Sequence, residues 1–319
     1  MVAQSRTTTP PPVVNVHYWY HKDTIKQLAR VAASLSKLSN SAFKRLAQAA
    51  LSATARKLSL ADPRVAVPVR LKPERYSQSH PLFKKSAAIL QSIAEADATA
   101  VFFKVLEQYA SLVGQLWPVR DRMGELEHVY ANSLGSGRST MTSQPEGSVD
   151  AIVTSPPYLG AQKYIRASSL SLGWLSMTEP NQLRSLEDQS IGREHFPSKA
   201  YNNEPRCPLP EAESLLKLVH LKNPLRAHIA SRYLIEMHEV IANCYRVLRR
   251  GGNLVLVSGC NMICCEVFDT TAFLQKICTR LGFHQTLEVT DVIKSRGLMT
   301  RRNKTAAVIP LESVTVFQK

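Results

Sequence analysis

Glycine is scarce in this sequence, with 13 among 319 residues. Gly135 and Gly137 stand in a loop rich in Gly, Ser and Thr that opens no helix, and Gly251-Gly252 follows a helical pattern as its terminator. No glycine-rich turn joins an apolar strand to a helix, the arrangement that lets a backbone approach a nucleotide closely. The chain by itself therefore lacks a recognisable nucleotide cradle.

Long apolar runs are also absent. No stretch approaches the ~20 apolar residues that cross a bilayer, and the Thr- and Pro-rich start has no apolar core of the signal-peptide type. The six cysteines are confined to the second half, where we expect free thiols in a reducing compartment. Cys260, Cys264 and Cys265 have no companion pair at zinc spacing, so we expect them in the core and predict no metal. These features favour a cytoplasmic protein without a membrane anchor.

Acidic residues are few relative to basic ones. Forty Lys and Arg against 25 Asp and Glu give a net charge of +15, and the sequence pI is near 9.7. Such a balance favours a polyanionic partner, nucleic acid before an anionic membrane surface. A hydrophobic content of 44% is enough for a substantial core.

Proline and the apolar periodicity divide the chain into three parts. Residues 1–16 are expected as a disordered tail, 17–125 as a helical spacer segment, and 126–319 as an α/β domain with a recognition insert at about 178–230. The periodicity predicts helices from Thr24 to Leu38, from Ser41 to Leu51, and over residues 81–117, 168–177, 234–250 and 271–281. Strands are predicted at 127–131, 151–154, 253–257, 286–289 and 306–317. Alternating strands and helices indicate the α/β class.

One stretch carries chemistry. The apolar strand from Ala151 to Thr154 stops at Ser155-Pro156-Pro157-Tyr158. Two consecutive prolines cannot donate to a sheet ladder and fix the backbone, so a strand end becomes a rigid loop that offers a hydroxyl and an aromatic ring. One interpretation is a turn that ends the strand and whose tyrosine only covers the core. We favour the other, in which the loop is a platform for a planar ligand.

The segment from Asp150 to Tyr158 resembles the catalytic motif of the S-adenosylmethionine-dependent DNA amino methyltransferases, in the Ser-Pro-Pro-Tyr version typical of the cytosine-N4 branch. Residues 246–257 and 301–319 resemble the family's later helix, strand and closing hairpin. The resemblance implies a Rossmann-like class I methyltransferase sheet, S-adenosylmethionine as cofactor, DNA as partner, and a role in bacterial or archaeal restriction-modification at the nucleoid. The resemblance also implies a mechanism. Ser155 and the loop carbonyls accept the hydrogens of the target amine, and Pro156 and Pro157 keep these acceptors in place. Tyr158 stacks on the flipped base.

Other residues take expected roles from the same resemblance. The expected cofactor-binding residues are Asn132, Asp150 and Thr154. Asn132 lies where the family often has an acidic residue near the adenosine of the cofactor. Basic residues that follow the motif or fill the last loop are candidates for DNA phosphates, and solvated surface charges are an equal alternative. These candidates are Lys163, Arg166, Arg296, Arg301, Arg302 and Lys304.

The sequence departs from the family in one respect. The glycine-rich turn Pro-Phe-x-Gly-x-Gly is missing, so the sheet is expected to lack its first strands and the cofactor to be bound jointly with a missing or separate half. A second polypeptide, a truncated reading frame and a non-catalytic relic are the three explanations, and we favour the first. Adenine-N6 methylation is the nearest alternative reaction, and a DNA-binding relic without turnover is the alternative outside enzymes. Methylation of RNA guanine or protein glutamine is disfavoured, because those enzymes more often begin the loop with Asn.

Overall fold

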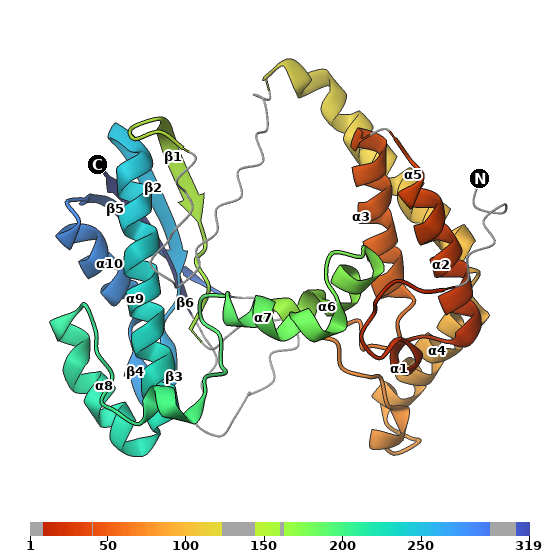
Figure 1. Cartoon of the computed structure of the whole chain (residues 1–319), viewed down its shortest axis with the longest axis horizontal. Helices are drawn as coiled ribbons and strands as arrows, with labels where there is room; N and C mark the ends of the chain where they lie inside the picture. Colours follow the sequence, from red (N-terminus) through yellow and green to blue (C-terminus); the bar gives the residue numbers. More distant parts are fainter. Residues whose placement is uncertain (1–8, 40, 123–143, 160–162, 294–310) are drawn as a thin grey trace. The chain divides into compact units, whose positions relative to one another are not determined.

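The computed structural model describes residues 9–39, 41–122, 144–159, 163–293 and 311–319 (Figure 1). The chain divides into two compact units, which are described separately. A helical unit comprises Met1–Glu127 and Tyr164–Leu186, and an α/β unit comprises His128–Lys163 and Glu187–Lys319. The helical unit thus includes a second stretch, Tyr164–Leu186, which the sequence pattern assigned to the catalytic domain.

Amphipathic helices build the helical unit. Its elements are α1 (Val16–Trp19), α2 (Lys22–Ser36), α3 (Ser41–Lys57), α4 (Pro81–Glu95), α5 (Ala98–Leu116) and α6 (Tyr164–Trp174), with 3-10 turns at Pro73–Arg75, Trp117–Arg122 and Pro180–Gln182. The helical region predicted over residues 81–117 is two helices, because the side chain of Asp97 caps α5 by accepting from the backbone of Thr99 and Ala100. Trp174 is buried and meets Tyr20 edge to face at 5.5 Å, so α6 contributes to this core.

A close backbone approach explains Gly173 on α6. A Cβ at this position would lie 2.7 Å from Cα of Val13 and 3.0 Å from the carbonyl oxygen of Pro12, so the backbone would have to move. We expect Gly173→Ala to destabilise the protein by roughly 1–3 kcal/mol, as overpacking does. The measurement is thermal unfolding followed by circular dichroism. The control is Gly114→Ala on α5, where nothing lies within 4 Å and alanine is expected to stabilise the helix by up to ~1 kcal/mol; equal effects of the two changes would contradict the packing argument.

The α/β unit contains a four-stranded sheet in the order β1-β2-β6-β5. Its elements are β1 (Val149–Thr154), α7 (Leu183–Asp188, which begins in the other unit), a 3-10 turn at Ser198–Tyr201, α8 (Pro210–Lys222), α9 (Pro224–Val247), β2 (Leu248–Ser258), a hairpin of β3 (Asn261–Ile263) and β4 (Glu266–Phe268), α10 (Thr270–Arg280), β5 (His284–Val292) and β6 (Leu311–Gln318). β1 and β2 are parallel, and the other neighbours in the sheet are antiparallel. The α/β class is confirmed, with a sheet that is partial and mixed.

Helices cover one face of the sheet, which we call the first face. Leu254, Leu256 and Phe317 point to this side and are almost fully buried in a core shared with α9 and α10. Figure 1 shows the long helix α9 lying against the sheet. The apolar stripe of α9 and the alternation along β2 are therefore read correctly from the sequence.

The opposite side, which we call the second face, is apolar and remains exposed among the residues that the structure describes. The strand register places one row of aliphatic side chains on it, with alternate residues of each strand. These are Val153, Val255, Val257, Leu287, Val289, Val314 and Val316, none of which is buried. Val153 is 73% exposed, Leu287 52% and Val289 49%. A soluble sheet that is apolar on both faces is one whose second face is normally covered.

Several predicted boundaries differ from the structure. The helix before Gly251 ends at Val247 instead of residue 250, because β2 already begins at Leu248 and Gly251, at φ 75°, lies within that strand. The insert at 178–230 is less irregular than expected: it contains α7, α8 and the start of α9, and Pro210 and Pro224 occupy first turns of helices instead of breaking them. The strand predicted at 127–131 lies outside the described residues.

The expectation that Cys260, Cys264 and Cys265 are buried is wrong. Cys260 and Cys265 are exposed and Cys264 is half-buried. Cys264 and Cys265 form the two-residue turn between β3 and β4, both with positive φ, which is the geometry of a tight hairpin. All six cysteines are free thiols.

Candidate active site

The predicted loop stands at the carboxyl end of β1. The strand ladder stops at Thr154, opposite Leu256 of β2. Ser155 is exposed, whereas Pro156 is buried and Leu159 is only 3% exposed within the core of the α/β unit. The buried Pro156 and Leu159 therefore hold the loop, while Ser155, which directly precedes Pro156, stays exposed to solvent. This arrangement fits a rigid platform better than a turn that only covers the core.

Two hydrogen bonds with other elements hold Tyr158 and Leu159, at the distal end of the loop. The hydroxyl of Tyr158 donates to Oε1 of Glu312 on β6 at 2.7 Å. The side-chain amide of Asn261 on β3 donates to the carbonyl oxygen of Leu159. Neither partner was found by sequence reasoning, because Glu312 is 154 positions away from Tyr158 and no motif connects them.

The insert after α7 also contacts this loop. A Cβ on Gly192 would lie 3.7 Å from the carbonyl oxygen of Tyr158 and 3.9 Å from Cβ of Pro157, and the φ of Gly192 is +76°. The insert therefore comes within van der Waals distance of the loop, and its backbone conformation there favours glycine.

Lys163 lies beside an acidic residue of that insert. Its ammonium is 3.3 Å from Oε2 of Glu194, whose other oxygen accepts from Arg226 at 3.2 Å. Burial raises the pKa of Glu194, but the hydrogen bond from Arg226 and the charges of Lys163 and Arg226 outweigh it, so the pKa lies below its ordinary value. Glu194 thus remains ionised and neutralises much of the charge that Lys163 offers to a phosphate.

A lowered pKa in the folded state has a definite consequence for stability. The carboxylate of Glu194 contributes stability that is fully present above its unfolded pKa and is lost as the pH falls through the lower folded value. We expect Glu194→Gln to flatten the loss of stability below about pH 4.5, the ordinary value of the group. Urea unfolding at a series of pH values measures this. Glu239→Gln is the control, since Glu239 has no ion pair in the described ranges, and an identical pH profile for the two variants would contradict the assignment.

The predicted cofactor-side residues separate in space. Thr154 adjoins Ser155 at the end of β1. Asp150 lies at the other end of the same strand, roughly 16 Å from Ser155 by the rise of an extended chain; its side chain is 81% exposed and pairs with Arg249 at 2.5 Å. The structure therefore does not bring Asp150 together with the loop. Asn132 lies outside the described residues.

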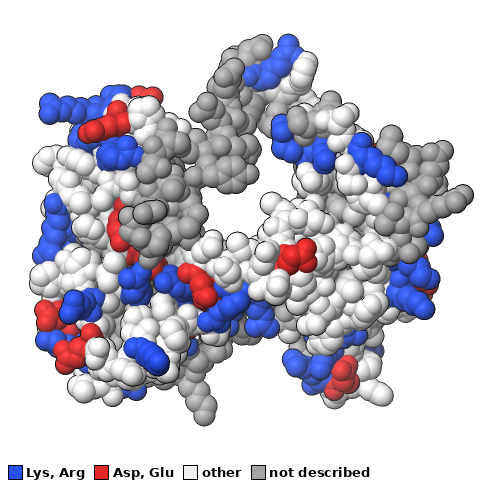
Figure 2. Space-filling model, viewed as in Figure 1, with Lys and Arg blue, Asp and Glu red and all other residues white. Residues whose placement is uncertain are grey.

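The predicted DNA contacts are distributed similarly. Arg166 is exposed on α6, which belongs to the helical unit. Arg296, Arg301, Arg302 and Lys304 lie outside the described residues. Figure 2 shows basic side chains scattered over the visible face of each unit instead of gathered in one patch. Of the two predicted cations in the described ranges, Lys163 belongs to the α/β unit that carries the loop and Arg166 to the helical unit.

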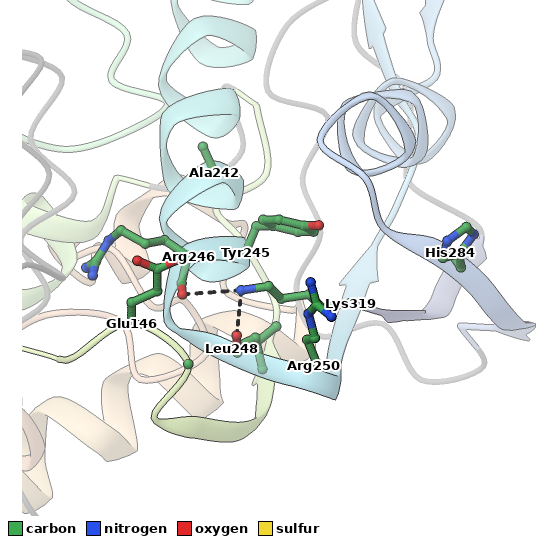
Figure 3. Close-up of a pocket in the computed structure, with 9 residues that line it drawn as sticks. Glu146, Ala242, Tyr245, Arg246, Leu248, Arg250, His284 and Lys319 are labelled. Carbon is green, nitrogen blue, oxygen red and sulfur yellow. Dashed lines mark hydrogen bonds between the residues drawn. The ribbon is translucent and has the colours of Figure 1, made fainter.

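A hollow of about 760 Å³ lies at the opposite end of the sheet from Ser155. Its walls include Arg246, Arg250, His284 and Lys319, but Figure 3 shows Arg246 and His284 at opposite sides of it. Lys319 donates to the carbonyl oxygens of Leu248 at 2.7 Å and Arg246 at 3.4 Å. Lys319 thus serves the end of α9, where the helix dipole and the last carbonyls favour positive charge.

Among the residues that the structure describes, no group of three or more His, Cys, Asp or Glu side chains is arranged to bind a metal ion. None of the helices in the described ranges combines the length and apolarity of a membrane crossing.

Comparisons with known proteins give only a slight likeness. No family model matches the chain, and no curated protein matches it. Among solved structures, the chain is similar to a protein of Thermus thermophilus assigned as a DNA modification methylase. With that protein complexed with S-adenosyl-L-methionine the identity is 22% and the TM-score 0.28, over 58% of this chain and 54% of the other. Its selenomethionine derivative gives 20% and 0.29 over 56% and 49%.

The chain therefore spans about half the length of the solved structures that it matches. A likeness this slight establishes no activity.

Proposed function

We propose that this chain is the catalytic part of a DNA amino methyltransferase, which transfers a methyl group from S-adenosylmethionine to the N4 amine of a cytosine flipped out of duplex DNA. The observation that carries the proposal is the loop at the end of β1: Ser155 is exposed while Pro156 and Leu159 are buried, and Tyr158 is anchored by Glu312. We place the protein in the cytoplasm of a bacterium or archaeon, in DNA modification or restriction, because its substrate is DNA.

The loop residues act on the target amine and not on the methyl donor. An exocyclic amine conjugated with its ring is a weak nucleophile, so its lone pair must be turned out of conjugation. The hydroxyl of Ser155 and the loop carbonyls accept the amine hydrogens, and the two prolines keep these acceptors fixed. The ring of Tyr158 stacks on the flipped base, which offsets part of the cost of unstacking. The cofactor, when bound, supplies the activated methyl group.

The described residues fit the base side of this site better than the cofactor side. Thr154 and the end of β1 offer one wall for a cofactor. Asp150 is too far from Ser155 to share that wall, and the sequence has no glycine-rich turn. We therefore propose that a second polypeptide carrying this turn completes the cofactor site.

The free edge of β1 is a place where a strand of such a partner can pair. In the described part of the chain β1 pairs with β2 alone, so its other edge is free for a parallel strand. The open second face adjoins this edge. Seven aliphatic side chains on four strands cover roughly 230 Å². Because ordinary monomers expose apolar patches of this size, the free edge of β1 supports the partner and the size of the patch does not.

The handedness of parallel sheets says what would cover the second face. Crossovers between parallel strands are right-handed, so the direction in which the chain crosses the sheet decides the face that receives the helix. From β1 to β2 the chain places α9 on the first face. Strands that continue outward from β1 in the other direction place their helices on the second face. A polypeptide with strands and helices, and not a lone helix, is therefore the proposed occupant.

Identifying the methylated base tests this function. DNA from cells that produce this chain together with a neighbouring frame encoding Pro-Phe-x-Gly-x-Gly is digested to nucleosides and analysed by mass spectrometry. We expect N4-methylcytosine. N6-methyladenine would establish the nearest alternative, because the loop chemistry serves either amine. DNA binding without any methylated base would identify the chain as a non-catalytic relic.

A further inference from the structure

Glu312 has no part in the mechanism above, yet its carboxylate accepts a hydrogen bond from Tyr158. It lies at the start of β6, is half-buried, and accepts the phenolic hydrogen at 2.7 Å. We infer that Glu312 is a positioning residue: its carboxylate fixes the orientation of the Tyr158 ring, on which the flipped base stacks. This inference rests on the proposed function for its role and on the hydrogen bond for its geometry.

The chemistry of the contact suits this role. A hydroxyl that donates to a carboxylate forms a short, charge-assisted bond, stronger than one between neutral groups. Tyrosine has only two side-chain torsions, so a ring held at its Cα and at its hydroxyl keeps little freedom. β6 is paired with β2 on one side and β5 on the other. Glu312 itself pairs with Asp291 of β5, and the ladder with β2 begins at the next residue, so Glu312 connects the far end of a loop side chain to a strand of the sheet.

The rest of the loop does not depend on this bond. Leu159 is buried in the core and its carbonyl oxygen accepts from Asn261, while Pro156 is buried on the other side. Loss of Glu312 is thus expected to remove this constraint on the ring of Tyr158 without displacing Ser155. This separation makes the inference testable by variants that still fold.

Nuclear magnetic resonance of the whole chain labelled with [13Cζ]tyrosine tests the contact itself. Tyr158→Phe identifies the signal of Tyr158 among the ten tyrosines. We expect Glu312→Ala to shift and broaden this signal alone, and Glu312→Gln, whose amide oxygen still accepts, to restore most of it. The control is Glu288→Ala, which removes a carboxylate of β5 that accepts from Gln285.

An unmoved signal in Glu312→Ala, or the same shift in Glu288→Ala, would overturn the inference. If Glu312→Ala shifts all ten signals, Glu312→Gln decides: a Tyr158 signal kept at its wild-type position supports the inference, and one displaced as far as in Glu312→Ala overturns it.

Kinetics of the chain with its partner polypeptide test the role. We expect Glu312→Ala and Tyr158→Phe each to raise KM for DNA roughly tenfold, as loss of one such bond does, with kcat changed by less than about threefold. The double variant is expected to be no worse than either single one. Additive effects would overturn the inference. If the wild type methylates no DNA, the proposed function fails, and the resonance experiment still decides whether Glu312 orients Tyr158.

Discussion

Simultaneous replacement of Ser155 and Tyr158 by alanine is expected to lower DNA methylation by roughly 10²–10⁴-fold. Two separate losses combine in this number. Tyr158→Ala removes the ring that stacks on the flipped base, worth about 1–3 kcal/mol. Ser155→Ala removes the exposed acceptor that turns the amine's lone pair toward the methyl donor, a geometric contribution that appears in kcat and not in binding. Tritium transfer from labelled S-adenosylmethionine to DNA measures both.

The chain offers a matched control for this double variant. Ser148→Ala and Tyr18→Ala together remove the same two side-chain types at exposed positions that are not part of the loop. This control is expected to stay within about threefold of the wild type, since surface changes away from a site have small effects. If the Ser155 and Tyr158 variant folds, joins its partner and methylates as well as the control, the loop is not the catalytic centre.

The second large effect concerns the cofactor. We expect this chain alone to give no measurable heat with S-adenosylmethionine in a calorimeter, and the complex with its partner polypeptide to bind it with a Kd of the order of micromolar, about 8 kcal/mol of binding free energy. The physical reason is that the described strands supply one wall of the site, while the turn that lets a backbone approach the cofactor is missing from the sequence. Tight binding by the chain alone would contradict the divided site.

A pair of valines locates the surface where the partner joins. Val153 on the second face is 73% exposed, and Val267 on β4 is 64% exposed. Val153→Lys is expected to abolish both association and cofactor binding, because it places an unpaired charge in an apolar interface beside the free edge of β1. Val267→Lys is expected to leave both unchanged. Equal behaviour of the two variants would contradict the proposal that the partner binds the second face.

Sequence reasoning succeeded where a local pattern determines the structure. Alternation along residues 253–257, the apolar stripe of α9 and the stop imposed by Pro156 and Pro157 are all local, so the α/β class and the position of the loop follow from them. The amphipathic helices α2 and α3 were predicted for the same reason.

It failed where distant residues or two competing tendencies decide. Glu312 and Asn261 meet the loop only through the order of the sheet, which no short pattern reveals. Cys264 and Cys265 look like core residues by type, yet a two-residue hairpin turn leaves Cys265 exposed and Cys264 half-buried. The placement of Asp150 was foreseeable: β1 ends at Thr154, so a residue near its start must lie at the amino end of the strand, away from the loop.

The most direct test of the central claim is the content of N4-methylcytosine in DNA from three strains, measured by mass spectrometry of nucleosides. One strain produces this chain alone, one produces it with the polypeptide that carries the glycine-rich turn, and one produces the pair with Ser155→Ala. We predict N4-methylcytosine in the second strain and none in the first. In the third strain the content is expected to be at least about tenfold lower than in the second. Equal methylation in the second and third strains, or none in any of them, would contradict the central claim.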